Sequence, residues 1–305
     1  MDVSVKKIIR NVTSSIVAIV AMFSVILTMG IVFFKTTLIN ENTYKNIFEK
    51  VGVYDEVLKS IEDNVTYALV VNNIKTDILD DLISKEEIVD AIDSVTYSVI
   101  GFLKGNDTVT SLDMGIYEKR VDDAINKYLR DNSMYLNESQ KNDIENMKSS
   151  IINIIDSELQ IVNFKELSSS APIKLLSKIV NILNNNLVLI GFIIINALLL
   201  RVFFLIWKTR RVRGFAWMGY TLVSAGLIVF LISFSGYLSK FYEYAVIAIP
   251  YVANTVGVII KTYLLNMSII SSVVIIIGLL SMSIYWKHLY RRYYNIYSNR
   301  AHKSL

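Results

Sequence analysis

Four long apolar segments constrain this chain more than any other feature of its sequence. They cover residues 12–35, 187–207, 215–238 and 263–286, and each holds 21 to 24 residues. An α-helix rises about 1.5 Å per residue, so about 20 apolar residues are enough to cross the hydrocarbon core of a bilayer. The sequence therefore predicts an all-α integral membrane protein with four transmembrane helices.

The composition agrees with a membrane protein and excludes several kinds of chemistry. Hydrophobic residues make up 53% of the 305 residues and charged residues 19%, against about 45–50% and about 25% in soluble domains. The chain has no Cys and two His, which excludes disulfides, thiolate metal sites and a Cys nucleophile. The signatures of P-loop, zinc-protease, serine-hydrolase and dinucleotide sites are absent from the sequence. We therefore expect a protein that is not an enzyme and holds no cofactor.

Charge is divided unevenly along the chain. Residues 36–186 hold 25 of the 27 acidic and 15 of the 31 basic residues, a net charge of −10, whereas the remainder carries +14. In that remainder most basic residues form three clusters, near the N-terminus, in the short loop 208–214 and in the tail 287–305. Their members are Lys6, Lys7 and Arg10; Lys208, Arg210, Arg211 and Arg213; and Lys287, Arg291, Arg292, Arg300 and Lys303.

These clusters predict the orientation of the spans. With four spans, all three clusters lie on one side of the membrane, and the positive-inside rule assigns that side to the cytoplasm. We expect a plasma-membrane protein with residues 1–11, 208–214 and 287–305 in the cytoplasm. Segment 12–35 is too long for the apolar region of a cleaved signal and no A-x-A site follows it, so it is predicted to be a signal anchor. Residues 36–186 then form an extracytoplasmic domain between the first two spans.

A further apolar stretch lies in 239–262, between the third and fourth spans. Its apolar core, 244–260, is short for a span, contains Pro250 and Asn254, and is flanked by Glu243 and Lys261. We expect an extracytoplasmic apolar hairpin or an interfacial helix here. The alternative, a fifth span, would move the C-terminal tail to the outer side of the membrane.

The 36–186 segment is predicted to be a helical bundle. Its apolar residues recur at the i, i+3, i+4, i+7 spacing of five or six amphipathic helices, and a segment of this length can bury its own core. Gly52 marks one helix end, while Ser84 with Glu87 and Asn137 with Gln140 are capping pairs. We predict that the last helix begins at Ala171–Pro172 and continues without a break through the second span to Trp207.

Acidic residues are concentrated in one part of this bundle. Asp77 and Asp81 are spaced to share a helix face, but the calcium-binding loop pattern of an EF-hand is absent. We therefore expect a solvated acidic face and no bound metal ion. The residues concerned are Asp77, Asp80, Asp81, Glu86, Glu87, Asp90 and Asp93.

Two polar residues lie inside the second span. Asn196 is near its midpoint, where an amide can hydrogen-bond a neighbouring helix. Arg201 lies in the inner half, within reach of the inner headgroups through its long stem. No Asp or Glu lies inside any span, which disfavours transport that depends on buried carboxylates.

Aromatic and basic residues alternate after the fourth span. On a helix the rings fall within an arc of about 100°, Lys287 and Arg291 flank that arc, and Arg292 lies further round. This pattern is typical of an anchor at the inner membrane interface. We expect it to contact an anionic inner leaflet and no nucleic acid. The anchor residues are Trp286, Lys287, Tyr290, Arg291, Arg292, Tyr293, Tyr294 and Tyr297.

Small residues four apart occur in three spans. Such pairs let helix backbones approach each other, and here they fit packing within one chain as well as a homo-oligomer. The pairs are Ser14/Ala18, Thr221/Ala225 and Ser268/Ser272.

The overall plan resembles that of known membrane proteins. A basic N-terminus, a signal anchor, an outer helical domain with capped segments such as ISKEEIVDAI, and three clustered spans are similar to uncharacterised four-span membrane proteins of low-GC Gram-positive bacteria. The resemblance implies a plasma-membrane location. The order of spans is also similar to that of ABC permeases of the mechanotransmitter type, which implies a cytoplasmic ATPase partner, although their outer domains usually contain strands.

From these features we expect a non-enzymatic integral membrane protein. Its outer helical domain would bind or organise a partner or ligand in the envelope, and its spans would anchor that domain. The alternatives are a permease-like mechanotransmitter subunit that works with an ABC ATPase, a transporter, and an enzyme with an outer active site.

Overall fold

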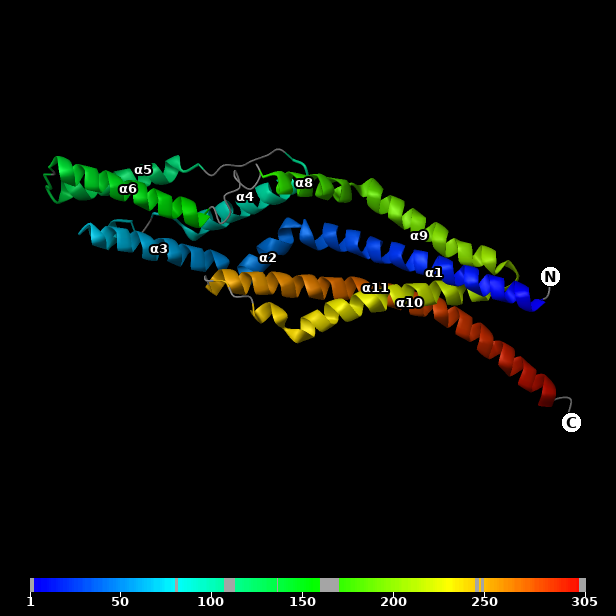
Figure 1. The fold of residues 1–305 in the computed structure, drawn as a ribbon. Coiled ribbons are helices and arrows are strands. Elements are labelled where there is room, and N and C mark those ends of the chain that lie inside the picture. Colours follow the sequence, from blue (N-terminus) through cyan, green and yellow to red (C-terminus); the bar gives the residue numbers. More distant parts are fainter. Residues whose placement is uncertain are drawn as a thin grey trace. The chain divides into compact units, whose positions relative to one another are not determined.

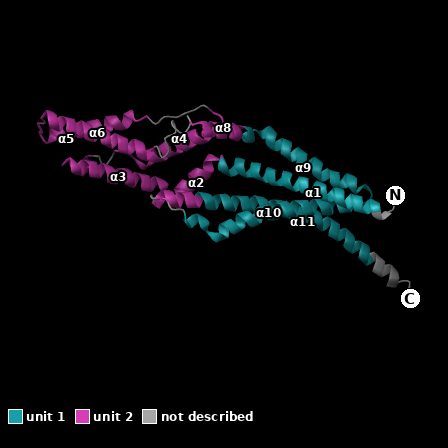
Figure 2. Ribbon diagram, viewed as in Figure 1, with its two compact units in different colours: residues 1–38, 182–245, 259–305 teal, residues 39–181, 246–258 magenta. Residues whose placement is uncertain are grey.

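The computed structural model describes residues 3–79, 82–106, 113–135, 137–159, 170–244, 247 and 250–301. Within these residues 91% are helical and none forms a strand, so the predicted all-α class is confirmed. The chain divides into two compact units, coloured separately in Figure 2. Unit 1 comprises Met1–Leu38, Ile182–Ala245 and Ile259–Leu305, and unit 2 comprises Ile39–Asn181 and Val246–Val258.

Unit 1 contains the four predicted apolar helices (Figure 1). These are α1 (Val3–Phe33), which ends in the π-helical turn η1 (Phe34–Leu38); α9 (Asn186–Ile206); α10 (Arg211–Ser239); and the long α11 (Pro250–Ala301). Two 3₁₀ turns, η3 (Lys208–Arg210) and η4 (Phe241–Tyr244), flank α10. By length and composition, four helices are able to cross a membrane: Val5–Leu38, Asn186–Ile206, Lys208–Ser239 and Pro250–Tyr294.

Helices α10 and α11 approach each other more closely than side chains would permit. A Cβ atom on Gly278 would lie 2.9 Å from the backbone N of Val223 and 3.0 Å from the carbonyl O of Gly219. The Ser233 and Ser268 hydroxyls hydrogen-bond each other at 2.9 Å across the same interface. Small residues thus serve helix packing within this chain, the role that they have in many membrane bundles.

The segment after η4 differs from the predicted hairpin. Pro250 is the first residue of α11, which continues for 52 residues to Ala301 without interruption. Proline suits this first helical position, because its fixed φ is helical and the N–H that it lacks would have no partner there. Residues 250–262 are therefore the first turns of the fourth long helix, and no turn separates them from 263–286.

Unit 2 is a bundle of amphipathic helices (Figure 2). These are α2 (Glu41–Val51), α3 (Val53–Val71), α4 (Lys85–Leu103), α5 (Gly115–Asp131), α6 (Glu138–Leu159) and the first part of α8 (Ala171–Asn184), with the 3₁₀ turn η2 (Thr76–Leu79) after α3. The apolar stripes that the sequence predicts meet in one core. Its most buried members are Val57, Ile61, Leu69, Ile88, Val121, Ile125, Ile151, Ile155 and Leu159.

The helix ends of unit 2 follow the predicted capping chemistry. Gly52 ends α2 with φ +76°, a left-handed conformation that glycine adopts without steric cost. Ser84 and Glu87 form a complete capping box at α4. Asn137 and Gln140 bond each other's backbone N–H groups at 3.0 and 2.8 Å before α6.

The predicted continuous helix from Ala171 to Trp207 is wrong. Helix α8 ends at Asn184 and α9 begins at Asn186, because Asn185 adopts an extended conformation and its side chain accepts a hydrogen bond from the Leu187 N–H. Asn side chains compete for backbone groups in this way and favour helix caps over helix interiors. The Nζ atom of Lys35 donates to the Asn184 carbonyl at 2.8 Å and so satisfies one orphaned acceptor at the break.

Candidate functional site

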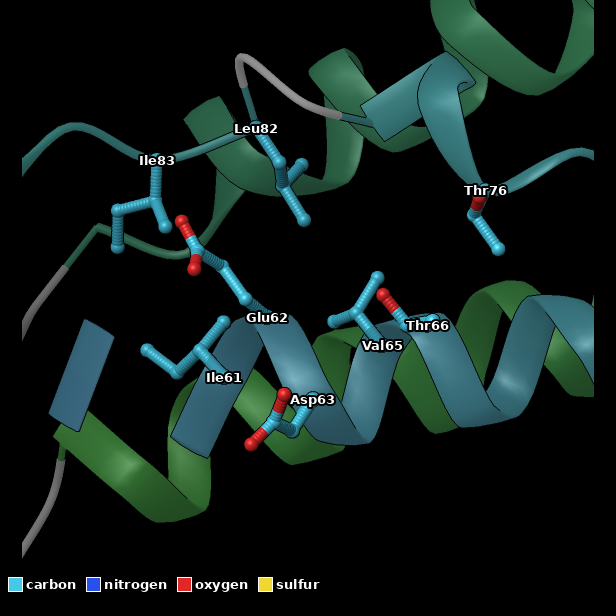
Figure 3. Close-up of a pocket in the computed structure, with 8 residues that line it drawn as sticks. All are labelled: Ile61, Glu62, Asp63, Val65, Thr66, Thr76, Leu82 and Ile83. Carbon is cyan, nitrogen blue, oxygen red and sulfur yellow. The ribbon is translucent and has the colours of Figure 1, made fainter. Parts of the chain in front are cut away.

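A groove on unit 2 is the candidate binding site (Figure 3). It has a volume of about 430 Å³ and lies between α3 and the segment that leads into α4. The floor is apolar and belongs to the core of the bundle, while the rim is polar and exposed. The floor residues are Ile61, Val65, Leu82 and Ile83, and the rim residues are Glu62, Asp63, Thr66 and Thr76.

The two rim carboxylates differ in direction. Figure 3 shows the carboxylate of Glu62 directed toward Leu82 and Ile83, whereas that of Asp63 points away from them. Neither side chain makes a hydrogen bond or ion pair with any residue in the described part of the chain. Helical periodicity explains the arrangement, because Ile61 and Val65 face the core and Glu62 stands beside them at the edge of that face. An apolar floor beside an unpaired carboxylate can hold a group with an apolar stem and a cationic tip.

An ion pair fixes one wall of the groove. Arg120 of α5 binds Glu87 in a bidentate geometry, at 2.7 and 3.0 Å, and donates to the carbonyl of Leu82 at 3.0 Å. Glu87 also accepts from the backbone N–H of Ser84. The hydrogen bonds from Arg120 lower the pKa of Glu87 to about 2, against its ordinary value of 4.5. The ion pair therefore joins α5 to the start of α4 and holds Leu82 in place.

A second polar cluster joins α2 and α3 to α4. Asp93 accepts hydrogen bonds from Lys45 and from the Tyr54 hydroxyl, each at 2.8 Å. Burial, together with the bond to Asp93, raises the pKa of Tyr54. Lys104, which follows the last residue of α4, forms an ion pair with Glu41 of α2 at 2.8 Å. These groups are satisfied by one another, so we interpret the cluster as structural.

Within unit 1, Asn196 hydrogen-bonds a neighbouring helix. Its Nδ2 atom donates to the Thr28 hydroxyl of α1 at 2.6 Å and to the Phe192 carbonyl at 2.9 Å. The Oδ1 atom is buried without a partner among the described residues. It borders an apolar groove of about 500 Å³ between α1, α9, α10 and α11. Arg201 is exposed on α9 and makes no interaction with the described residues.

Contacts between helices bring the three basic clusters to one end of unit 1. The indole N–H of Trp207, next to the basic loop, donates to the buried Ser14 hydroxyl of α1 at 3.0 Å. Ser281 of α11 donates to the carbonyl of Phe215 at 2.9 Å. We call this the basic end, defined by Lys6, Lys7, Arg10, Lys208, Arg210, Arg211, Arg213, Lys287, Arg291 and Arg292.

No described acidic side chain lies at the basic end. Unit 1 contains two acidic residues, Asp2 and Glu243. Asp2 is outside the described residues, and Glu243 lies beyond the opposite end of α10, 3.5 Å from Lys240. Arg213 stacks over the Trp207 ring at 4.9 Å. The cations of the basic end are therefore available to an external anion.

The predicted inner-interface anchor lies on the last turns of α11. Trp286, Tyr290, Tyr293 and Tyr294 are between 58% and 73% exposed, so no described part of the chain covers these rings. Tyr297 lies in the same helix, and its side chain is outside the described residues. Lys287, Arg291 and Arg292 are also exposed.

Several residues of the candidate sites could not be identified from the sequence, and two of the predicted acidic residues lie outside the described part of the chain. Nothing in the sequence distinguishes Glu62 from other surface carboxylates, because the groove depends on how the segment after η2 covers α3. Nothing in the sequence indicated that Thr28 contacts α9 or that Lys35 contacts the break between α8 and α9. Asp80 and Asp81 lie outside the described residues. Among the residues that are described, no group of three or more His, Asp or Glu side chains is arranged to hold a metal ion.

Comparison with known proteins gives no relative for this chain. No family model matches it, and neither any curated protein nor any solved structure shows significant similarity. The functional argument therefore depends on the geometry and charge of the two units.

Proposed function

We propose that this chain is a non-enzymatic integral membrane protein whose unit 2 binds a partner on the outer side of the plasma membrane. The groove beside α3 carries this proposal, because it offers an apolar floor and a carboxylate that has no partner among the described residues, within the strongly acidic 36–186 segment. Apolar surface with a few polar groups is the usual composition of a ligand site. The complementary partner is a peptide segment with a Lys or Arg side chain between apolar ones.

The orientation of the protein follows from its charges. The basic end faces the cytoplasm by the positive-inside rule, with both termini on that side. The acidic unit 2 then lies outside, inserted between the first and second spans. Its net charge attracts cationic segments and repels anionic ones, which favours the selection of a cationic partner.

Two alternatives are less well supported by particular features. The outer domains of mechanotransmitter permeases usually contain strands, and none occurs among the described residues of this chain. A transporter usually carries ionisable groups within its spans, and here no Asp or Glu lies in the four apolar segments. The permease alternative gains support if an ATPase copurifies with the chain.

Binding of short blocked peptides to the purified full-length protein tests the proposal. We expect the peptide Leu-Lys-Leu to bind more tightly than Leu-Glu-Leu, and the Glu62→Gln variant to bind Leu-Lys-Leu about two- to fivefold more weakly, because the ion pair with this exposed carboxylate is lost. Glu118→Gln is the matched control, since Glu118 is an exposed glutamate of α5 outside the groove. Equal affinity of the Glu62 variant and the unaltered protein would exclude the groove as the site.

A further inference from the structure

The basic end of unit 1 combines two features that point to the same ligand. Its cations have no acidic partner among the described residues, and the last turns of α11 expose four aromatic rings next to three of those cations. Exposed rings of this size are normally covered by something, and unpaired cations attract anions. A ligand that satisfies both carries a negative headgroup attached to apolar chains.

We propose that the α11 arm, defined as residues 286–294, binds anionic phospholipid headgroups of the membrane leaflet on the cytoplasmic side. The arm continues without a break from the apolar segment 263–286 of the same helix, so its rings follow directly after that segment. Tyr and Trp rings prefer this interfacial depth, and Lys and Arg beside them meet lipid phosphates. The proposal depends on the insertion of unit 1 in a membrane, and on no property of the groove in unit 2.

The placement of side chains on the arm favours contact along the membrane surface. On a helix, Trp286, Tyr290, Tyr293 and Tyr294 occupy one arc of about 100°, and Lys287 borders that arc. From Trp286 to Tyr294 the helix rises about 12 Å, more than the depth of about 5–7 Å of one headgroup layer. An arm perpendicular to the membrane would carry its last rings beyond the lipids. We infer that it tilts, so that all four rings lie at headgroup depth.

The arm has room for this arrangement. Figure 1 shows the last turns of α11 running clear of α1, α9 and α10, the other long helices of unit 1. The high exposure of the rings agrees with this view. A second cationic surface lies close to the start of the arm, because Ser281 and Phe215 connect α11 to the helix that follows the basic loop. The loop cations Lys208, Arg210 and Arg211 then meet the same lipid layer.

Lipid binding to the full-length protein, measured by native mass spectrometry in detergent, tests the proposal. We expect short-chain phosphatidylglycerol to bind at least tenfold more tightly than phosphatidylcholine. The variant Lys287→Gln/Arg291→Gln/Arg292→Gln should have a markedly smaller preference, because each cation near the lipid surface favours the anionic headgroup and only the loop cations remain. The matched control, Lys240→Gln/Lys261→Gln, removes cations outside the basic end and should keep the preference.

Further measurements distinguish the lipid from other anionic ligands. Equal phosphatidylglycerol binding by the triple variant and the unaltered protein overturns the proposal. Displacement of the lipid by glycerol 3-phosphate at similar concentration shows a soluble phosphate site, and displacement by polyglutamate shows an acidic protein surface; either outcome also overturns it. Resistance of the protein to alkaline extraction from membranes is measured separately, so failure of membrane insertion is distinguished from failure of lipid recognition.

Discussion

Single residues in this protein mostly act by completing a neighbour's hydrogen bonds. Lys35 satisfies a carbonyl at the end of α8, Thr28 accepts from Asn196, and Arg120 holds Glu87 while it also bonds the Leu82 carbonyl. Buried or partly buried polar groups without partners are costly, so such residues matter more than their exposed charge indicates. Arg120 has the widest effect, because its contacts define both a helix start and a groove wall.

The Glu87–Arg120 pair makes the start of α4 sensitive to acid. Glu87→Gln keeps the capping acceptor but removes the charge, and we expect it to weaken local stability by about 1–2 kcal/mol, since the pair is partly exposed. Hydrogen exchange of residues 84–92 should then be about 5–30-fold faster than in the unaltered protein at pH 6. Glu118→Gln, on an exposed glutamate without a partner among the described side chains, should leave exchange unchanged.

The same pair predicts a pH dependence with a definite sign. The pKa of Glu87 is lowered to about 2 in the folded state, against 4.5 ordinarily, so its contribution is complete above pH 4.5 and is lost as the pH falls toward 2. The difference in exchange between Glu87→Gln and the unaltered protein should therefore narrow between pH 5 and pH 2.5. A difference that stays constant over this range would show that the charge of Glu87 does not stabilise α4.

At the scale of helices, the sequence pattern was informative where residues within one helix determine that the helix forms. Apolar periodicity and caps predicted the helices of unit 2 and the four apolar helices, because both depend on residues near in sequence. The break at Asn185 and the unbroken start of α11 at Pro250 were not predicted. At Asn185 the capping side chain competes with a continuous apolar pattern and interrupts the helix. At Pro250 the proline occupies the first helical position, where it begins a helix and does not break one.

The candidate site was less predictable than the fold. Ile61 and Val65 were recognisable as core positions, but Glu62 became a rim residue only because Leu82 and Ile83 lie opposite it. Contacts between segments about 20 residues apart leave no periodic trace in the sequence. The basic end was different, because its cations were visible as three clusters, and what the structure adds is the set of hydrogen bonds that brings them together.

Close packing of α10 on α11 gives a prediction at this scale. Leucine at Gly278 would collide with the backbone of Val223 and Gly219, so we expect Gly278→Leu to lower stability by about 1–3 kcal/mol or more. Thermal unfolding of the purified protein, followed by the fluorescence of Trp207, Trp217 and Trp286, measures the effect. Gly191→Leu is the matched control, because a Cβ at Gly191 meets nothing within 4 Å. Equal melting temperatures for the two variants would contradict the tight α10–α11 interface.

At the scale of the whole molecule, the division of charge and the division into units coincide. Unit 1 holds 16 basic residues and two acidic residues, and unit 2 holds the other 25 acidic residues. A segment with almost no acidic residues can enter a membrane and contact an anionic surface with little electrostatic free-energy cost, whereas the acidic bundle is suited to water. The two units carry net charges of opposite sign, so the net charge of +4 for the whole chain represents neither of them.

The proposed orientation is testable because the chain contains no cysteine. A single cysteine at Tyr135, which is 98% exposed in unit 2, should react with a membrane-impermeant maleimide on intact cells. A single cysteine at Lys208, in the exposed basic loop, should react only after the membrane is opened. Labelling in the reverse order would show the inverted topology, with unit 2 in the cytoplasm.

Helix α11 has a consequence for how this protein can change its length during evolution. Its first turns belong to unit 2, where Tyr251 packs against the core, and its later turns belong to unit 1, where Ser268 meets α10. Each residue added to a helix turns everything beyond it by about 100°. An insertion of one to three residues between these two positions would therefore rotate one contact face of α11 out of phase with the other. An insertion of about seven residues, two full turns, would bring the two faces nearly back into phase, so the stretch between Tyr251 and Ser268 can lengthen only in such steps.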